Sequence, residues 1–212
     1  MDNNINELDK LIDYIIEKHD LINSEWMTSN NYNKYNMKSK KVTDILKDSK
    51  LSDYIFDYRN FINIYYTSLF QEINNLRLKN QVEIRVKMYN SLQDKINRYC
   101  IETKHEYGHI PINKCVNDLL GFRIIFSKSI DMNQIIDYIK NKYNNLLCID
   151  SSKDGYIATH IYFTKDSNYD FRWELQLWNL ESYDNNKKCH EIYKQDYTKY
   201  ESDLIREGDA NV

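Results

Sequence analysis

The stretch GYIATHIYF (155–163) alternates between aliphatic side chains and polar or aromatic ones, as a half-buried β-strand does. Its two isoleucines and Phe163 are expected to face the core. Tyr156 and His160 then fall together on the opposite face, where a strand of this kind usually meets solvent. The question raised by this strand is what a tyrosine–histidine face is for.

A second alternating stretch, FRWELQLW (171–178), follows after a short connection. Trp173 and the two leucines share one face, and Glu174 and Gln176 share the other. We expect residues 156–164 and 171–178 to pair as a β-hairpin, with their polar faces side by side. Two adjoining polar faces form either the floor of a binding site or the solvent-exposed side of an antiparallel sheet.

The remaining periodicity predicts helices and strands on both sides of this hairpin. Helical spacing recurs over 4–23, twice more within 42–80, and over 91–100, 132–143 and 182–205. Ser91 is placed to cap the helix over 91–100. Strand patterns cover 82–87, 121–126 and 145–150, and a polar loop covers 29–41. The predicted fold class is α+β: a mixed, largely antiparallel five-stranded sheet flanked by helices.

The order of these elements suggests how the chain is organised. We expect a helical N-terminal extension over 1–80, a catalytic-type domain over 81–205 and a tail over 206–212. No internal repeat and no linker rich in Pro, Gly or Ser divides the chain.

The composition is that of an ordinary soluble globular chain, with 42% hydrophobic residues and 29% charged residues among 212. A net charge of −3 argues against a general nucleic-acid-binding surface, although a local basic groove remains possible. The four cysteines form no CxxC pair, so we expect reduced thiols and a cytoplasmic protein. The N-terminal residues carry acids and no continuous apolar run, so we expect no signal peptide and no membrane association.

Four cations are spaced so that they can point at one volume. Arg85 and Lys87 are two apart on a predicted strand, and Lys95 and Arg98 are three apart on the following helix. Convergent cations suit a polyphosphate, whose charge is spread over several oxygens. The alternative is a solvated charged surface, which is common for Lys and Arg.

A carboxylate lies at the mouth of the next strand, in CVNDLLGFRIIF (115–126). Asp118 precedes the glycine that opens this strand, and Arg123 lies within it. A carboxylate in such a position can hold Mg²⁺, which takes oxygen ligands and keeps substrate phosphates as others. The alternative is that Asp118 caps a turn and Arg123 forms a surface ion pair.

Two histidine motifs point to other chemistry. HEYGH (105–109) fits the H-E-x-x-H pattern of zinc proteases, but Gly108 and Pro111 indicate that any helix ends there. His19 and Asp20 form the His-Asp pair of metal-dependent phosphohydrolases, but a chain with five histidines offers few further ligands. We expect neither activity.

Read in order, the motifs are R-x-K, K-x-x-R, D-x-x-G-x-R, K-x-G-Y-x-x-x-H and E-x-Q, beginning at residues 85, 95, 118, 153 and 174. This series resembles the synthetase domain of the RelA/SpoT family, and in particular its small alarmone synthetases. The resemblance covers about residues 82–195. It implies a nucleotidyltransferase-like fold and the transfer of pyrophosphate from ATP to the ribose 3′-hydroxyl of GTP or GDP, which yields (p)ppGpp and AMP.

The resemblance also implies roles for individual residues. Asp118 and Glu174 would bind Mg²⁺ and, with Arg123, would be the catalytic residues. Tyr156 would stack on the acceptor base. The ATP phosphates would be held by Arg85, Lys87, Lys95, Arg98 and Arg123. The remaining acceptor contacts would come from Lys153, His160, Gln176 and His190.

Departures from the family pattern leave the acceptor open. Trp178 and Asn179 stand where housekeeping members commonly have Arg and Thr, and Ala158 stands where the family has Ser. These features resemble the toxic branch of small alarmone synthetases, found in toxin–antitoxin pairs. There the acceptor is the 3′-CCA end of tRNA or an adenosine nucleotide, and the partner is an antitoxin protein. The loop lysines Lys38, Lys40 and Lys41 would then contact tRNA phosphates. A further alternative is an inactive synthetase fold that serves as a regulatory module.

Overall fold

A computed structural model gives the fold of the protein and describes residues 2–29, 34–164 and 167–192. Five strands form one sheet in the order β1-β2-β5-β4-β3. Only β2 and β5 run parallel, and the other neighbouring pairs are antiparallel. The strands are β1 (Gln81–Val86), β2 (Leu120–Phe126), β3 (Leu147–Asp150), β4 (Thr159–Phe163) and β5 (Trp173–Asn179). The predicted α+β class, with a mixed and largely antiparallel sheet, is confirmed.

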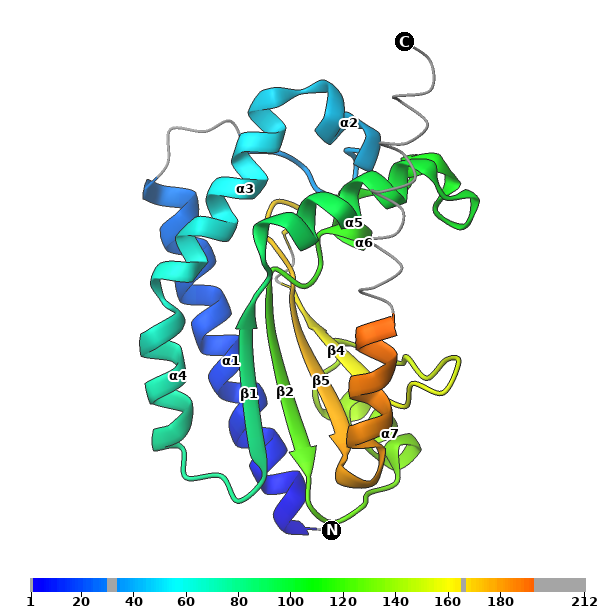
Figure 1. Ribbon diagram of the computed structural model, residues 1–212. Coiled ribbons are helices and arrows are strands. Elements are labelled where there is room, and N and C mark those ends of the chain that lie inside the picture. The colour runs from blue at the N-terminus through cyan, green and yellow to red at the C-terminus, as the bar shows by residue number, and fades with distance from the viewer. Residues whose placement is uncertain (1, 30–33, 165–166, 193–212) are drawn as a thin grey trace.

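Helices flank the sheet on both sides (Figure 1). The longest is α1 (Asp2–Ser29), which lies beside α3 and α4. The other helices are α2 (Val42–Lys47), α3 (Ser49–Ile64), α4 (Tyr66–Asn75), α5 (Tyr89–Ile101), α6 (Ile112–Cys115) and α7 (Met132–Lys142). Short 3₁₀ turns cover η1 (Thr103–Gly108) and η2 (Leu180–Ser182). Residues 183–192 are helical, and the rest of the helix expected over 182–205 lies outside the described residues, as does the tail over 206–212.

One face of the sheet carries the core. Leu8 and Leu11 of α1 and Ile55 of α3 belong to the same buried cluster as Leu175 and Leu177 of β5. The N-terminal helices therefore complete the core of the sheet, because they cover an apolar face that would otherwise meet water. The helical residues 183–192 lie on the opposite face, where Tyr183 and Cys189 pack against a small cluster that includes Tyr156 and Trp178.

The region over 42–80 differs from the expectation of two helices. It contains three, because Asp48 is extended and ends α2 while its carboxylate accepts a hydrogen bond from the Leu51 amide, which starts α3. A further break at Tyr65 separates α3 from α4.

The expected cap at Ser91 is also wrong. Helix α5 begins at Tyr89, after an extended Met88, so Ser91 lies inside the first turn. The Tyr89 ring packs on Phe56 of α3, with ring centroids 4.5 Å apart. This packing favours an earlier helix start than the local capping signal indicates.

The stretch over 155–163 is a strand only from Thr159 onward. Asp154 and Gly155 both have positive φ, 51° and 86°, and close a tight turn in which Lys153 and Tyr156 are bridged. Tyr156 therefore precedes the strand and is buried, whereas Ile157, expected in the core, is 49% exposed. The Asp-Gly pair explains the late start of the strand, since two consecutive residues with positive φ form a turn and cannot belong to an extended strand.

The two histidine motifs have structural roles. Glu106 and Tyr107 are left-handed, so His105 and His109 do not lie one α-helical turn apart, and His105 stacks on Tyr99 at 3.6 Å. His19 is buried and shares a 2.9 Å hydrogen bond with the Phe171 carbonyl. Among the described residues, no group of three His, Cys, Asp or Glu side chains is arranged to hold a metal ion.

No helix in the described ranges combines the length and apolar character that crossing a bilayer requires.

The turn before β4 yields a stability test. Gly155→Ala is expected to lower the free energy of unfolding by about 1–2 kcal/mol, because a side chain at φ 86° is strained. Asp154→Gly is the matched control, since glycine accepts the φ of 51° at that position. Urea denaturation measures both variants. Equal stability of Gly155→Ala and the parent would contradict the left-handed turn.

Candidate active site

The second face of the sheet carries two rows of polar side chains, set by strand register. In the first row, Glu83 is opposite Arg123, Arg123 is opposite Gln176, and Gln176 is opposite His160. In the second row, Arg85 is opposite Gly121, Gly121 is opposite Glu174, and Glu174 is opposite Tyr162. Gly121 has no side chain, and the Arg85 side chain lies over it, with Nε 3.4 Å from where a Cβ would be. The expected adjoining polar faces are confirmed.

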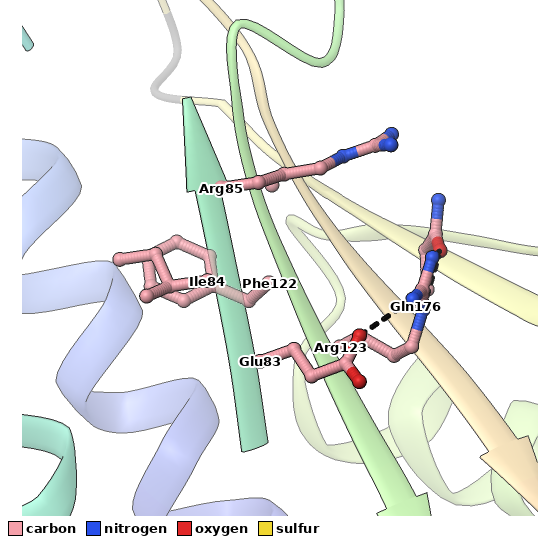
Figure 2. A pocket seen from close by; sticks show the side chains of 7 residues that line it. Glu83, Ile84, Arg85, Phe122, Arg123 and Gln176 are labelled. Atoms are coloured by element: carbon pink, nitrogen blue, oxygen red, sulfur yellow. Dashed lines mark hydrogen bonds and ion pairs between the residues drawn. The ribbon is translucent and has the colours of Figure 1, made fainter. Parts of the chain in front are cut away.

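Figure 2 shows Glu83, Arg123 and Gln176 of the first row, together with Arg85 of the second row. Arg85 extends over the sheet, while the Arg123 guanidinium lies against Gln176 and Glu83. A small cavity of about 60 Å³ lies between them. It adjoins a larger pocket, since Arg85 and Gln176 line both.

The larger pocket has a volume of about 430 Å³ and opens at the ends of β1 and β5. Four cations and two carboxylates line it, together with two histidines. The lining is Arg85, Val86, Lys87, Met88, Ser91, Lys95, Arg98, Asp118, His160, Glu174, Gln176 and His190. All four cations that the spacing predicted to converge are among them. Because cations outnumber carboxylates here, the pocket suits an anionic ligand.

Asp118 lies between the lysines. Lys87 Nζ is 2.8 Å from its Oδ2, Lys95 Nζ is 3.0 Å from its Oδ1, and an Arg85 nitrogen is 3.8 Å from Oδ2. Burial alone would raise the pKa of Asp118, but the attraction of Lys87 and Lys95 outweighs it and holds the pKa well below its usual range. Burial lowers the pKa of Lys87, whereas Asp118 overcomes burial at Lys95 and raises its pKa. The carboxylate is therefore ionised, and it organises the cations around it.

Glu174 is held at both oxygens. His160 Nδ1 is 3.1 Å from Oε1, and the Gln176 amide donates to Oε2 at 2.7 Å. Only 5% of the residue is exposed. Burial would raise its pKa, but the contact with His160 outweighs burial and lowers the pKa of Glu174 to about 2.

Arg123 lies outside the larger pocket and contacts residues that line it. Its Nε and one terminal nitrogen donate to Gln176 Oε1 at 3.1 and 2.9 Å, and its other terminal nitrogen donates to Glu83 at 2.6 Å. Its guanidinium also lies 3.6 Å from the centre of the Trp178 ring. Arg123 lines the small cavity and not the larger pocket.

Only some of the predicted acceptor-binding residues line the larger pocket. His160, Gln176 and His190 line the pocket. Tyr156 lies behind them, 9% exposed, with its hydroxyl 2.9 Å from His160 Nε2. Lys153 is on the surface beside Asp154 and does not line the pocket. His190 packs against Trp178 and Tyr156, and burial, with the charges of Arg123 and Arg85, lowers its pKa to about 4.

Several residues of this site were missed by sequence reasoning. Glu83 alternates with Arg85 on β1, so the period of the strand placed it on the polar face, but its pairing with Arg123 depends on register with β2. Ser91 lines the pocket, although its sequence signal was that of a helix cap. Tyr162 shares the face of His160, and its hydroxyl is 3.4 Å from His160 Nδ1.

No protein-family model matches the sequence, and no curated protein matches it. The chain resembles solved small alarmone synthetases. Small alarmone synthetase 1 of Bacillus subtilis aligns at 21% identity over 77% of this chain and 90% of its own, with a TM-score of 0.41. The same protein bound to its product pppGpp aligns at 18% identity over 77% and 96%, also with a TM-score of 0.41. Small alarmone synthetase 2 of Bacillus subtilis aligns at 17% identity over 68% and 80%, with a TM-score of 0.40.

Removal of the Asp118 charge is expected to destabilise the fold. Asp118→Asn leaves Lys87 and Lys95 buried without their carboxylate, so we expect a loss of about 3–5 kcal/mol in the free energy of unfolding. Glu72→Gln, which breaks the more exposed ion pair with Lys18, is the control and should cost less than about 1 kcal/mol.

The same variant has a pH signature. The pKa of Asp118 is lower in the folded chain than in the unfolded one, so its stabilisation is present above the unfolded value of about 3.9 and fades as pH falls below it. The difference between parent and Asp118→Asn, measured by urea denaturation, should therefore shrink below about pH 4. A difference independent of pH would contradict the assigned ion pairs.

Proposed function

We propose that the protein is an ATP-dependent pyrophosphokinase that transfers the β,γ-pyrophosphoryl group of ATP to a ribose 3′-hydroxyl, with GTP or GDP as acceptor. The observation that supports it is the pocket itself: four cations and two carboxylates line one pocket beside the polar face of the sheet. Positioning and charge neutralisation, which phosphoryl-type transfer chiefly requires, are what such side chains supply.

The reaction is a displacement at the β-phosphorus. The acceptor 3′-oxygen forms a bond to this phosphorus while the bond from it to the α,β-bridging oxygen breaks, and AMP leaves with that oxygen. Arg85, Lys87, Lys95 and Arg98 would hold the phosphates and the charge that develops on the leaving group. The hydroxyl proton passes to solvent or to a pocket base.

Glu174 suits metal binding better than proton abstraction from the 3′-hydroxyl. With a pKa of about 2 it is a weak base, whereas an ionised carboxylate binds a cation and accepts a hydrogen bond from a hydroxyl well. We therefore assign it to orienting the acceptor hydroxyl and to metal binding.

The chemistry of the two carboxylates fits Mg²⁺. Asp118 and Glu174 line the same pocket, and Mg²⁺ usually takes one or two carboxylates together with waters and substrate phosphates. Both are ionised, as ligands must be. When bound there, Mg²⁺ would supply charge neutralisation to the phosphates. Lys87 and Lys95 are already paired with both oxygens of Asp118. Arriving phosphates would therefore have to draw these lysines away before Asp118 could bind Mg²⁺.

The decisive assay offers γ-labelled ATP and Mg²⁺ to separate acceptors: GTP, GDP, adenosine nucleotides and deacylated tRNA. We expect label in a guanosine tetra- or pentaphosphate, and we expect Glu174→Gln to abolish it while AMPCPP still binds in a calorimetric titration. Label in tRNA or in an adenosine nucleotide alone would instead assign the toxin-like activity. Absence of label from every acceptor would contradict the proposed function and favour an inactive regulatory module.

A further inference from the structure

The Tyr156 ring is surrounded by other aromatic side chains and leaves no face free on which a base could stack. Its ring is edge-on to His160, Trp178 and His190, at interplanar angles of 78°, 80° and 81°. The side chain is 9% exposed, so no open ring face meets the pocket. Its hydroxyl, in contrast, has two hydrogen-bonding partners, so we infer that Tyr156 acts through its hydroxyl.

These partners form a continuous chain of hydrogen bonds. The Trp178 Nε1–H donates to the Tyr156 hydroxyl at 3.2 Å, and this hydroxyl is 2.9 Å from His160 Nε2. His160 Nδ1 is in turn 3.1 Å from Glu174 Oε1. Trp178 is fully buried and Glu174 nearly so, which makes an unsatisfied group in this chain costly.

Counting protons assigns the direction of every bond. The indole N–H can only donate a hydrogen bond, so the Tyr156 oxygen accepts from it. The Tyr156 proton then needs an acceptor, and within the described residues the polar group that can take it is His160 Nε2. Nδ1 faces a carboxylate oxygen, so Nδ1 carries the ring proton. His160 therefore carries its ring proton on Nδ1 and accepts the Tyr156 hydrogen bond at Nε2.

We propose that Trp178 and Tyr156 are positioning residues that fix this tautomer of His160 and, through it, the orientation of the Glu174 carboxylate. The second oxygen of Glu174 is fixed by Gln176, whose own amide is oriented by Arg123. Both arms meet at Trp178, because the Arg123 guanidinium lies over its ring. The effect of this chain on turnover rests on the proposed function, whereas the tautomer does not.

The test separates the hydroxyl of Tyr156 from its ring. Tyr156→Phe keeps an aromatic ring for stacking but removes the hydrogen bond to His160. We expect kcat to fall about 10–100-fold, as for other groups that orient a ligating side chain, while KM for ATP changes less than about twofold. Tyr183→Phe is the matched control, since Tyr183 also packs edge-on against Trp178 but directs its hydroxyl to Glu83. Its kcat should stay within about twofold of the parent. Thermal unfolding confirms that both variants fold.

A spectroscopic measurement decides the tautomer without any assay of activity. In ¹⁵N spectra of the histidine side chains, with His160 assigned from His160→Gln, the parent should show a protonated Nδ1 and a bare, hydrogen-bonded Nε2. Tyr156→Phe should shift this signature, and Tyr183→Phe should leave it unchanged. A protonated Nε2 in the parent, or full kcat in Tyr156→Phe, would overturn the proposal. If the parent transfers no label at all, the proposed function fails, and the spectra still decide whether the chain of hydrogen bonds exists.

Discussion

The contact between Asp118 and its two lysines is the interaction on which the rest of the site depends. Three buried charges at this point require each other, because an unpaired charge removed from water is costly. Their arrangement ties the end of β1 to α5 and to the loop before β2. One carboxylate cannot neutralise Lys87, Lys95, Arg85 and Arg98 together, so the folded chain retains an excess of positive charge facing a pocket. A bound polyphosphate would neutralise this excess positive charge.

The second carboxylate is built differently. Glu174 has no lysine partner among the described residues, and it is instead held by hydrogen bonds from His160 and Gln176. The groups behind these two, Tyr156 and Arg123, both contact the indole of Trp178. A carboxylate oriented in this way by buried neighbours needs little reorganisation when a substrate arrives, which is how preorganised sites lower a reaction barrier.

The alternation of residues on the strands carried most of the information in the sequence. It predicted five strands and placed Glu174 and Gln176 on one face of their strand, because the period of a strand is two whatever the rest of the fold does. It failed at Tyr156, where two left-handed residues begin a turn before the strand starts. The start of α5 depended on packing of Tyr89 against Phe56, 33 residues earlier in the chain, and no local signal reports such a contact.

The site was predicted in part for similar reasons. Convergence of the four cations followed from spacing on a strand and a helix joined by a short turn. Which group pairs with which depended on register between strands far apart in sequence. Arg123 shows this, since it faces Glu83 and Gln176 and stands behind the larger pocket. The contacts of the Tyr156 hydroxyl include a hydrogen bond accepted from Trp178, a residue for which the sequence suggested no partner.

The central claim, that the pocket moves a pyrophosphoryl group from ATP, is tested most directly by ³¹P NMR of the protein with ATP, Mg²⁺ and GTP. The account predicts that AMP and a 3′-diphosphate appear together in equal amounts, with no ADP. Formation of ADP with orthophosphate or with a monophosphorylated acceptor would show that the γ-phosphoryl group alone is moved, and it would contradict the account.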